Sequence, residues 1–259
     1  QVPGRWPMTA PSQSPDSPAM HPAPLTSIAT LYRIMMGSQY KVLRLIGLGL
    51  LGLLGVLLAL VINNTADRPL NAVTDWVANY GFRIVLPVVA VMVATSLLGN
   101  LIEDKLMVYL WMKPIPRWHI ATAAWAATST VLLLVAVLPL LLMAAVNGDG
   151  GLVSSTFVAA LLGTAAYAGL FVGLSAQFSR PMWIGFLYIL LWEGALASLT
   201  DGFGRIAVAS YLLSLLADGS GIDLPLDGRA TWAQYLLPVL IAIGGVAFAS
   251  WRLSTRDID

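Results

Sequence analysis

Six long apolar segments constrain this chain more than any other feature of its sequence. Each approaches or exceeds the roughly 20 apolar residues that an α-helix needs to cross the hydrocarbon core of a bilayer. Composition agrees, since 58% of the residues are hydrophobic and only 10% are charged, whereas about a quarter are charged in a typical soluble domain. The sequence therefore predicts an all-α integral membrane protein with six transmembrane helices: Leu45–Ile62, Ile84–Ile102, Trp118–Val146, Leu152–Phe178, Pro181–Leu199 and Trp232–Trp251.

The segments before and after this six-span domain (25–256) differ from it in composition. Residues 1–24 are rich in Pro and Ser, and they hold too little apolar surface to offset the entropy of ordering them, so we expect a disordered tail. Residues 26–44 combine apolar side chains at helical spacing with Arg33, Lys41 and Arg44. That pattern is typical of a helix lying in the membrane interface, although it also fits an extension of the first span. Residues 257–259 form a short C-terminal tail.

The longest polar connection, 200–231, contains a second helical pattern. Ile206–Leu216 has helical spacing but only 11 residues, which is too short to cross a bilayer. We expect it to lie at the outer leaflet or to dip into it.

The distribution of basic residues predicts the orientation. Ten lie on one side of the predicted spans and four on the other, and the side with more Lys and Arg is normally cytoplasmic. Both termini and the loop 103–117 are therefore expected in the cytoplasm, in a multi-pass protein of the cytoplasmic (inner) membrane. The ten are Arg5, Arg33, Lys41, Arg44, Lys105, Lys113, Arg117, Arg180, Arg252 and Arg256, and the four are Arg68, Arg83, Arg205 and Arg229.

Several kinds of chemistry are missing from the sequence. There is no cysteine, which excludes disulfides, thiolate metal sites and cysteine nucleophiles. A P-loop requires a lysine after a glycine, but Lys41, Lys105 and Lys113 follow Tyr, Asp and Met. The two histidines, His21 and His119, are too few for a histidine metal site or a serine triad, and no basic aromatic surface suggests nucleic acid. We therefore predict no catalytic, cofactor or metal residues and no enzyme activity in this chain.

Small residues predict where helices pack closely. Four glycines lie between Gly47 and Gly55 in the first span, Gly169 and Gly173 form a G-x-x-x-G pattern, and Gly244 and Gly245 are adjacent in the last span. Such positions let transmembrane backbones approach one another, either within one subunit or between subunits.

Glu193 is the one charged residue inside the six predicted segments, and Tyr188 and Trp192 lie near it. A carboxylate at membrane depth is costly, so it should face the bundle interior or an aqueous cavity. It is either part of a translocation path or a polar tie between helices. We favour the tie, because Glu193 lies six residues from the end of its segment, Leu199.

A compact charged element connects the second and third segments. Glu103, Asp104 and Lys105 follow the second segment directly. Leu106, Tyr109, Leu110 and Lys113 would share one helical face, and Pro114 and Pro116 would end that helix. The pattern predicts a short helix across the cytoplasmic end of the bundle, where it could transmit a push from a partner protein.

The run LLGNLIEDKLMVYLWMKPIPRWHI resembles the cytoplasmic segment of the type-2 permease family of bacterial ATP-binding-cassette (ABC) transporters. Glu103, Tyr109, Leu110, Pro114 and Arg117 match its acidic residue, coupling helix and Pro-x-x-Arg-like turn. The stretch Phe178–Leu196 is similar to the fourth-to-fifth-span region of that family. One departure is Asp104–Met107, where many members carry a Glu-x-Gly-Thr-like stretch.

The resemblance implies the permease subunit of an exporter, working with a second permease subunit, identical or homologous, and with two ATPase subunits that bind ATP and Mg. It implies that Glu103, Asp104, Tyr109 and Arg117 couple the permease to the ATPases, next to Pro114 and with Lys105 and Lys113 at the rim. The substrate is not implied. The rival hypothesis is a self-contained ion-coupled secondary transporter or channel that uses Glu193, and a membrane enzyme is a third alternative.

Overall fold

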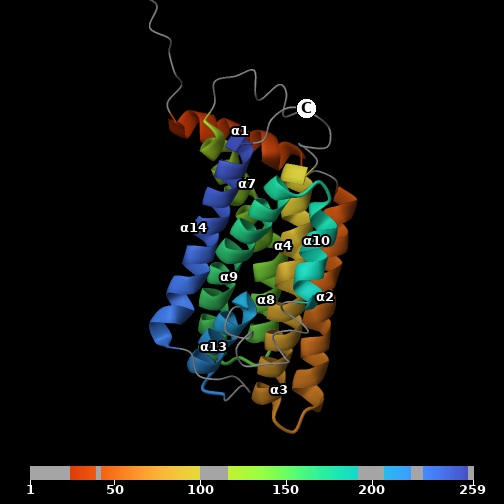
Figure 1. Ribbon diagram of the computed structural model, residues 1–259. Helices are drawn as coiled ribbons and strands as arrows, with labels where there is room; N and C mark the ends of the chain where they lie inside the picture. The colour runs from red at the N-terminus through yellow and green to blue at the C-terminus, as the bar shows by residue number, and fades with distance from the viewer. Residues whose placement is uncertain (1–23, 39–41, 100–115, 192–206, 223–229, 256–259) are drawn as a thin grey trace, which may run out of the picture.

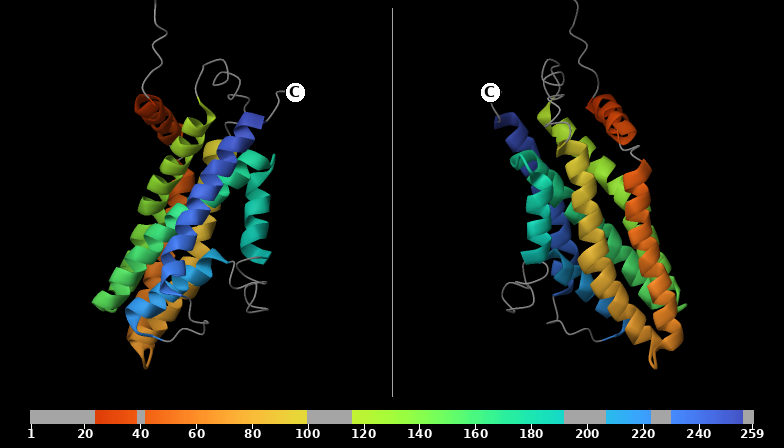
Figure 2. Two further views of the ribbon diagram at one scale, coloured as in Figure 1. Left: turned by 60° about the vertical axis from the view of Figure 1, so that its left-hand side comes forward. Right: turned by 90° about the vertical axis from the view of Figure 1, so that its right-hand side faces the viewer.

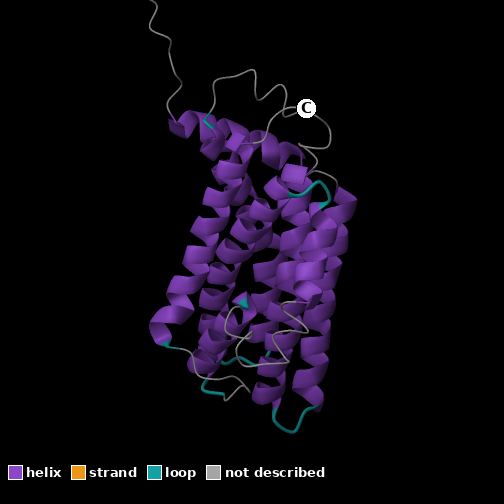
Figure 3. Cartoon of the chain, viewed as in Figure 1, coloured by secondary structure: helices purple, strands orange, loops and turns teal. Residues whose placement is uncertain are grey.

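The computed structural model describes residues 24–38, 42–99, 116–191, 207–222 and 230–255. Within these ranges every regular element is a helix and none is a strand (Figure 3), so the predicted all-helical fold is confirmed for the described part of the chain. The elements are α1 (Pro24–Ser38), α2 (Val42–Thr65), α3 (Pro69–Trp76), η1 (Val77–Val85), α4 (Leu86–Ala94), η2 (Thr95–Gly99), α7 (Arg117–Leu132), η3 (Leu133–Val137), α8 (Leu138–Ala145), α9 (Gly150–Gln177), α10 (Pro181–Tyr188), α13 (Val208–Ser220) and α14 (Thr231–Thr255).

Five helical stretches are long and apolar enough to cross a membrane. They are Ile46–Thr65, Pro69–Leu98, Arg117–Ala145, Gly150–Gln177 and Thr231–Thr255. The remaining predicted span, Pro181–Leu199, is described only as the short apolar helix Pro181–Leu191. The structure therefore supports a multi-pass membrane protein, and the six-span count stays a prediction.

The predicted start of the second span is wrong. We expected it to begin at Ile84, but the helix begins at Pro69 and continues through η1 without a break. The reason is burial, since Val73, Val77 and Phe82 are 0% exposed and hold this stretch in the bundle. Glu193 is therefore not the only charged residue within the spans, and Arg83 no longer counts among the basic residues of the outer connections.

The helices form a bundle (Figures 1 and 2). Of the five long stretches described, two are central, two are peripheral, and Arg117–Ala145 is intermediate. The apolar window of Pro69–Leu98 is 78% buried and that of α9 is 61% buried, whereas those of α2 and α14 are only 22% buried. α1 lies across one end of the bundle, which we call the α1 end, and the α2–α3 turn lies at the opposite end, the α3 end (Figure 1). α14 finishes at the α1 end, where Arg252 Nε donates a hydrogen bond to Gln177 Oε1 at the end of α9.

Close helix contacts occur at several of the predicted glycines, and they lie within this subunit. A Cβ on Gly169 would lie 2.6 Å from the Ala242 carbonyl oxygen of α14, and one on Gly245 would overlap the Gly169 carbonyl group. Gly52 packs against Pro139, which a Cβ would approach to 2.6 Å. Nothing lies within 4 Å of a Cβ on Gly47 or Gly49. The glycines thus let α14 lie against α9, and α2 against α8.

α1 is a helix separate from α2 and shorter than the predicted 26–44. It ends at Ser38, and α2 begins at Val42. Leu31 and Met35 are buried, and the Tyr32 hydroxyl donates a 3.1 Å hydrogen bond to Thr130 Oγ1 of α7. Arg33 and Ile34 are exposed, so α1 has one face on the bundle and one face away from it.

α13 covers the pattern predicted at Ile206–Leu216 and has 13 residues. It packs along the half of α9 nearest the α3 end: its Leu212 contacts the position of Gly163 at the middle of α9, and its Gly219 contacts Ser155 near the start. All residues from Val208 to Leu216 are buried.

Candidate functional site

The predicted coupling element is described only where it joins α7. Arg117 is the first residue of α7 and is half-buried. The other predicted coupling residues lie outside the described part of the chain: Glu103, Asp104, Lys105, Tyr109, Lys113 and Pro114.

The start of α7 is tightly ordered by local geometry. Pro116 has an extended ψ of 135° and precedes the helix, and the His119 N–H donates a 3.0 Å hydrogen bond to the Pro116 carbonyl oxygen. The Trp118 ring lies edge-on to the His119 ring, with centroids 4.1 Å apart.

The His119 side chain is buried and only 3% exposed. Neither ring nitrogen has a hydrogen-bond partner. A metal would need further ligands, and the described ranges contain no cluster of three or more His, Cys, Asp or Glu side chains. His119 is therefore a buried imidazole whose ring contacts Trp118 and whose two nitrogens lack hydrogen-bond partners.

α7 connects this turn to the rest of the bundle. The Trp125 indole N–H donates a 3.1 Å hydrogen bond to the Ala165 carbonyl oxygen of α9, and Thr130 accepts one from Tyr32 of α1. A displacement at Arg117 would thus reach both the central helix and the helix across the α1 end.

Of the predicted intramembrane polar group, Tyr188 alone is described; Trp192 and Glu193 lie outside the described residues. Tyr188 is half-buried at the end of α10, and its ring meets Phe171 of α9 edge-on, with centroids 6.0 Å apart. Phe171 in turn stacks with Tyr167 at 6.0 Å. Tyr188 therefore lies beside an aromatic cluster on the central helix.

Sequence reasoning missed a row of polar residues on the second membrane helix. Asn71, Asp75, Asn79 and Arg83 recur every four residues and are all exposed, while the residues between them are buried or half-buried over most of the row. We call these four residues the polar row. The spacing is visible in PLNAVTDWVANYGFRIV, but it could be recognised only after this stretch was assigned to a membrane helix.

The π-helical winding of η1 keeps the polar row on one face. An α-helix has 3.6 residues per turn, so a step of four residues turns slightly more than once around the axis. Side chains four positions apart therefore shift gradually to one side along an α-helix. A π turn contains more residues, because its hydrogen bonds reach one residue further. A step of four residues then makes less than one full turn, so the side chains shift to the opposite side. Since α3 passes into η1 after Trp76, the two shifts oppose each other along the row.

Contacts with neighbouring helices place Arg83 near the middle of the bundle. Arg83 lies one turn before Leu86, whose Cδ2 would be 2.7 Å from a Cβ on Gly163, at the midpoint of α9. On the other side, Gly81 lies against Leu140, five residues before the end of α8, so Gly81 is in the half of the bundle nearer the α3 end. An arginine at the centre of a bilayer costs about 2.5–3.5 kcal/mol on insertion scales and more in simulations. Lipid alone is therefore a poor environment for the exposed Arg83 side chain.

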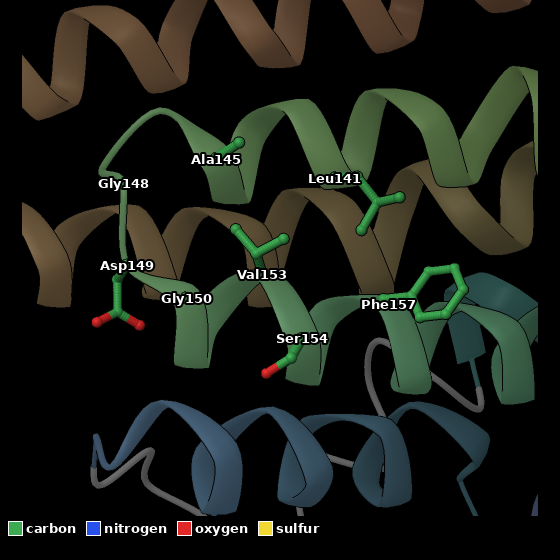
Figure 4. A pocket seen from close by; sticks show the side chains of 8 residues that line it. All are labelled: Leu141, Ala145, Gly148, Asp149, Gly150, Val153, Ser154 and Phe157. Atoms are coloured by element: carbon green, nitrogen blue, oxygen red, sulfur yellow. The ribbon is translucent and has the colours of Figure 1, made fainter.

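The pockets of the described bundle offer little further chemistry. One of about 450 Å³ lies between α8 and the start of α9 (Figure 4). Asp149 is its charged residue, and this carboxylate caps α9 by accepting a 2.6 Å hydrogen bond from the Leu152 N–H. A second pocket, of about 570 Å³, lies between α7 and α14 and is lined mainly by apolar side chains, including Trp118, Trp125 and Trp251.

A third pocket, of about 330 Å³, lies near the α3 end. Within it, Gln234 Nε2 donates a 2.9 Å hydrogen bond to Asp218 Oδ2.

Neither a family model, nor a curated protein, nor a solved structure matches this chain.

Proposed function

We propose that this chain is the membrane-spanning permease subunit of an ABC transporter, working as an exporter in the cytoplasmic membrane. In this proposal a second permease subunit completes the path, and two ATPase subunits bind ATP and Mg beneath it. The sequence support is the resemblance of the segments 97–120 and 178–196 to type-2 permeases.

The observation that carries the proposal is the position of α7. The charged segment that ends at Arg117 leads directly into this helix, which belongs to a 29-residue stretch reaching from end to end of the bundle. α7 is hydrogen-bonded to α1 through Tyr32 and to α9 through Trp125. A force applied to the segment before Arg117 would therefore move a rigid helix and both of its neighbours together.

The packing of the bundle fits a subunit that works with a second membrane subunit. α2 leaves large apolar side chains exposed along its length, among them Leu50, Leu53 and Leu57, which are 51–57% exposed. The polar row lies on the neighbouring helix. Lipid suits the leucines but not the row, so we expect a second permease subunit to face this side of the bundle and to leave room for water along the row.

The test is to solubilise the chain from its native membrane in mild detergent and to assay the purified complex for Mg-dependent ATP hydrolysis. We expect a co-purifying P-loop ATPase whose hydrolysis is coupled to transport after reconstitution. A chain that purifies intact without an ATPase, and that transports in response to an ion gradient alone, would instead establish the ion-coupled alternative with Glu193. Arg83 does not favour that alternative, because arginine does not release its proton in proteins.

A further inference from the structure

We infer that the polar row lines a water-filled cavity that enters the membrane from the α3 end, and that Arg83 attracts hydrophilic anions at its inner end. This inference does not rest on the ATPase partnership, because the cavity is a property of the membrane helices and can be measured without ATP.

The first step is that the polar row is not covered by the bundle. Asn71, Asp75, Asn79 and Arg83 are all exposed. Asn79 Nδ2 donates a 2.9 Å hydrogen bond to the Asp75 carbonyl oxygen on the same helix. Across the described ranges, no side chain forms an ion pair or hydrogen bond with the Arg83 guanidinium group. The row therefore faces away from the protein core.

The second step is that lipid does not cover the row either. The row begins at Asn71, two residues after the start of its helix, and reaches Arg83, one turn from the level of the α9 midpoint. It thus extends about 18 Å along the helix, at a rise of 1.5 Å per residue. Polar residues at this depth normally face a bundle interior or a water-filled cavity. Water reaching inward from the α3 end satisfies all four residues.

The third step concerns the shape of this side of the bundle. The stretch from α3 through η1 to α4 lies between α2 and α10 when the bundle is viewed from that side (Figure 2, right). α2 passes alongside it, since Trp76 and Tyr80 donate hydrogen bonds to α2 carbonyl oxygens. We therefore take the polar row as one wall of the inferred cavity, with α2 beside it.

The fourth step is the order of charges along the wall. Asp75 lies nearer the α3 end, and Arg83 lies two turns further in. Arginine keeps its positive charge in proteins and binds carboxylate and phosphate groups through its planar fork. In a cavity with low-dielectric walls, such a charge raises the local concentration of counter-ions. The inner end should therefore select anions.

The experiment uses the absence of cysteine from the sequence, so that each single cysteine variant carries one thiol. Asp75→Cys, Asn79→Cys and Arg83→Cys are compared with Leu53→Cys and Leu57→Cys, whose side chains are 51% and 52% exposed on the apolar face of α2. Charged methanethiosulfonate reagents are applied to open membrane fragments, in which both membrane faces are accessible. The reagents need a thiolate, which forms readily only in water.

We expect Asn79→Cys and Arg83→Cys to react at least about tenfold faster than the two leucine variants, because only the row meets water at this depth. Equal, slow labelling of all four variants would overturn the cavity. Asp75→Cys guards against misfolding: fast labelling there, in a protein that elutes as a single species, shows that the fold and the entrance are intact.

Anion selection is tested in the Asn79→Cys background with a sulfonate-bearing and a trimethylammonium-bearing reagent. Adding Arg83→Gln should lower the ratio of anionic to cationic labelling rates about three- to tenfold, as expected for a unit charge roughly one helical turn away. Arg83→Lys should keep the ratio, and Asp75→Asn should raise it. A ratio that Arg83→Gln leaves unchanged would overturn the anion site, whatever the result of the ATPase assay.

Discussion

The Tyr80 hydroxyl donates a 2.8 Å hydrogen bond to the Leu51 carbonyl oxygen of α2. One turn away, the Trp76 indole N–H donates a 3.0 Å hydrogen bond to the Gly55 carbonyl oxygen, and the two aromatic rings stack with centroids 4.6 Å apart. Gly55 allows this approach, because a Cβ there would lie 2.5 Å from the Tyr80 ring. The pair therefore fixes the peripheral helix α2 against the second membrane helix.

Replacing Tyr80 by phenylalanine should test this attachment. Tyr80→Phe keeps the stacking and removes one hydrogen bond, so the free energy of unfolding should fall by about 0.5–1.5 kcal/mol. We expect a value near the lower end of this range, because hydrogen bonds between membrane helices contribute little on average. Unfolding in mixed detergent micelles would measure the change. Tyr235→Phe, on the exposed face of α14, is the matched control and should have little effect. Equal effects of the two variants would contradict the role of the Tyr80 hydroxyl.

The contact between α9 and α14 predicts opposite outcomes at two adjacent glycines. Gly245→Ala should destabilise the protein by about 1–3 kcal/mol, because the new methyl group overlaps the Gly169 backbone and the helices must separate. Gly244→Ala should be neutral or slightly stabilising, because nothing lies within 4 Å of a Cβ there and alanine favours the helix. Thermal unfolding of the two purified variants would compare them. A Gly245→Ala variant as stable as Gly244→Ala would show that the helices can separate without cost.

Neutralising the coupling element should separate ATP hydrolysis from transport. In the double variant Glu103→Ala/Arg117→Ala, we expect normal folding and continued ATP hydrolysis, with transport per ATP reduced at least about tenfold, a change of about 1.4 kcal/mol in coupling. Arg180→Ala, an exposed arginine at the turn before α10, controls for the loss of a charge. The measurement is simultaneous ATPase and transport assays in proteoliposomes. Unchanged coupling in the double variant would count against a role for this element.

Glu193→Gln distinguishes a polar tie from an ion-coupling group. Glutamine keeps hydrogen-bonding capacity but cannot exchange a proton, so a residue that acts as a neutral tie should tolerate the change. We therefore expect transport within about twofold of the unmodified protein, which corresponds to less than about 0.5 kcal/mol. Severe loss of transport in a well-folded Glu193→Gln protein would support the ion-coupled alternative.

Replacing the buried His119 should stabilise the protein. Its two ring nitrogens have no hydrogen-bond partner, and a buried polar group without a partner costs about 1–3 kcal/mol. His119→Leu removes these nitrogens and should raise the unfolding temperature, whereas His119→Asn keeps unpaired polar atoms and should not. Detergent-based thermal unfolding would rank the variants. A marked loss of stability in His119→Leu would show that the imidazole has a partner in the membrane.

Much of the fold could be predicted because hydropathy is a local property. Four of the predicted spans correspond to long apolar helices of nearly the same bounds, and Gly169 and Gly245 were recognised as points of close approach. Hydropathy failed to predict the start of the helix that contains Arg83, which begins at Pro69 and not at Ile84. A charge ends a hydrophobic window, but it does not end a helix whose neighbours Phe82 and Val85 are buried. Of the predicted site, Arg117 and Tyr188 could be placed on helices, and their proposed roles stay predictions.

By itself, the sequence determined that the protein is helical and crosses a membrane, because each apolar segment has the length and composition that a bilayer requires. Only the tertiary structure decided which helices are central, that α9 and α14 meet through Gly169 and Gly245, and that Arg83 lies on an exposed face, one turn before the residue that meets the α9 midpoint. These properties depend on contacts between residues far apart in the chain, such as Tyr80 with Leu51 and Leu86 with Gly163. Helical periodicity specifies the faces of one helix, whereas packing selects the neighbour that each face meets.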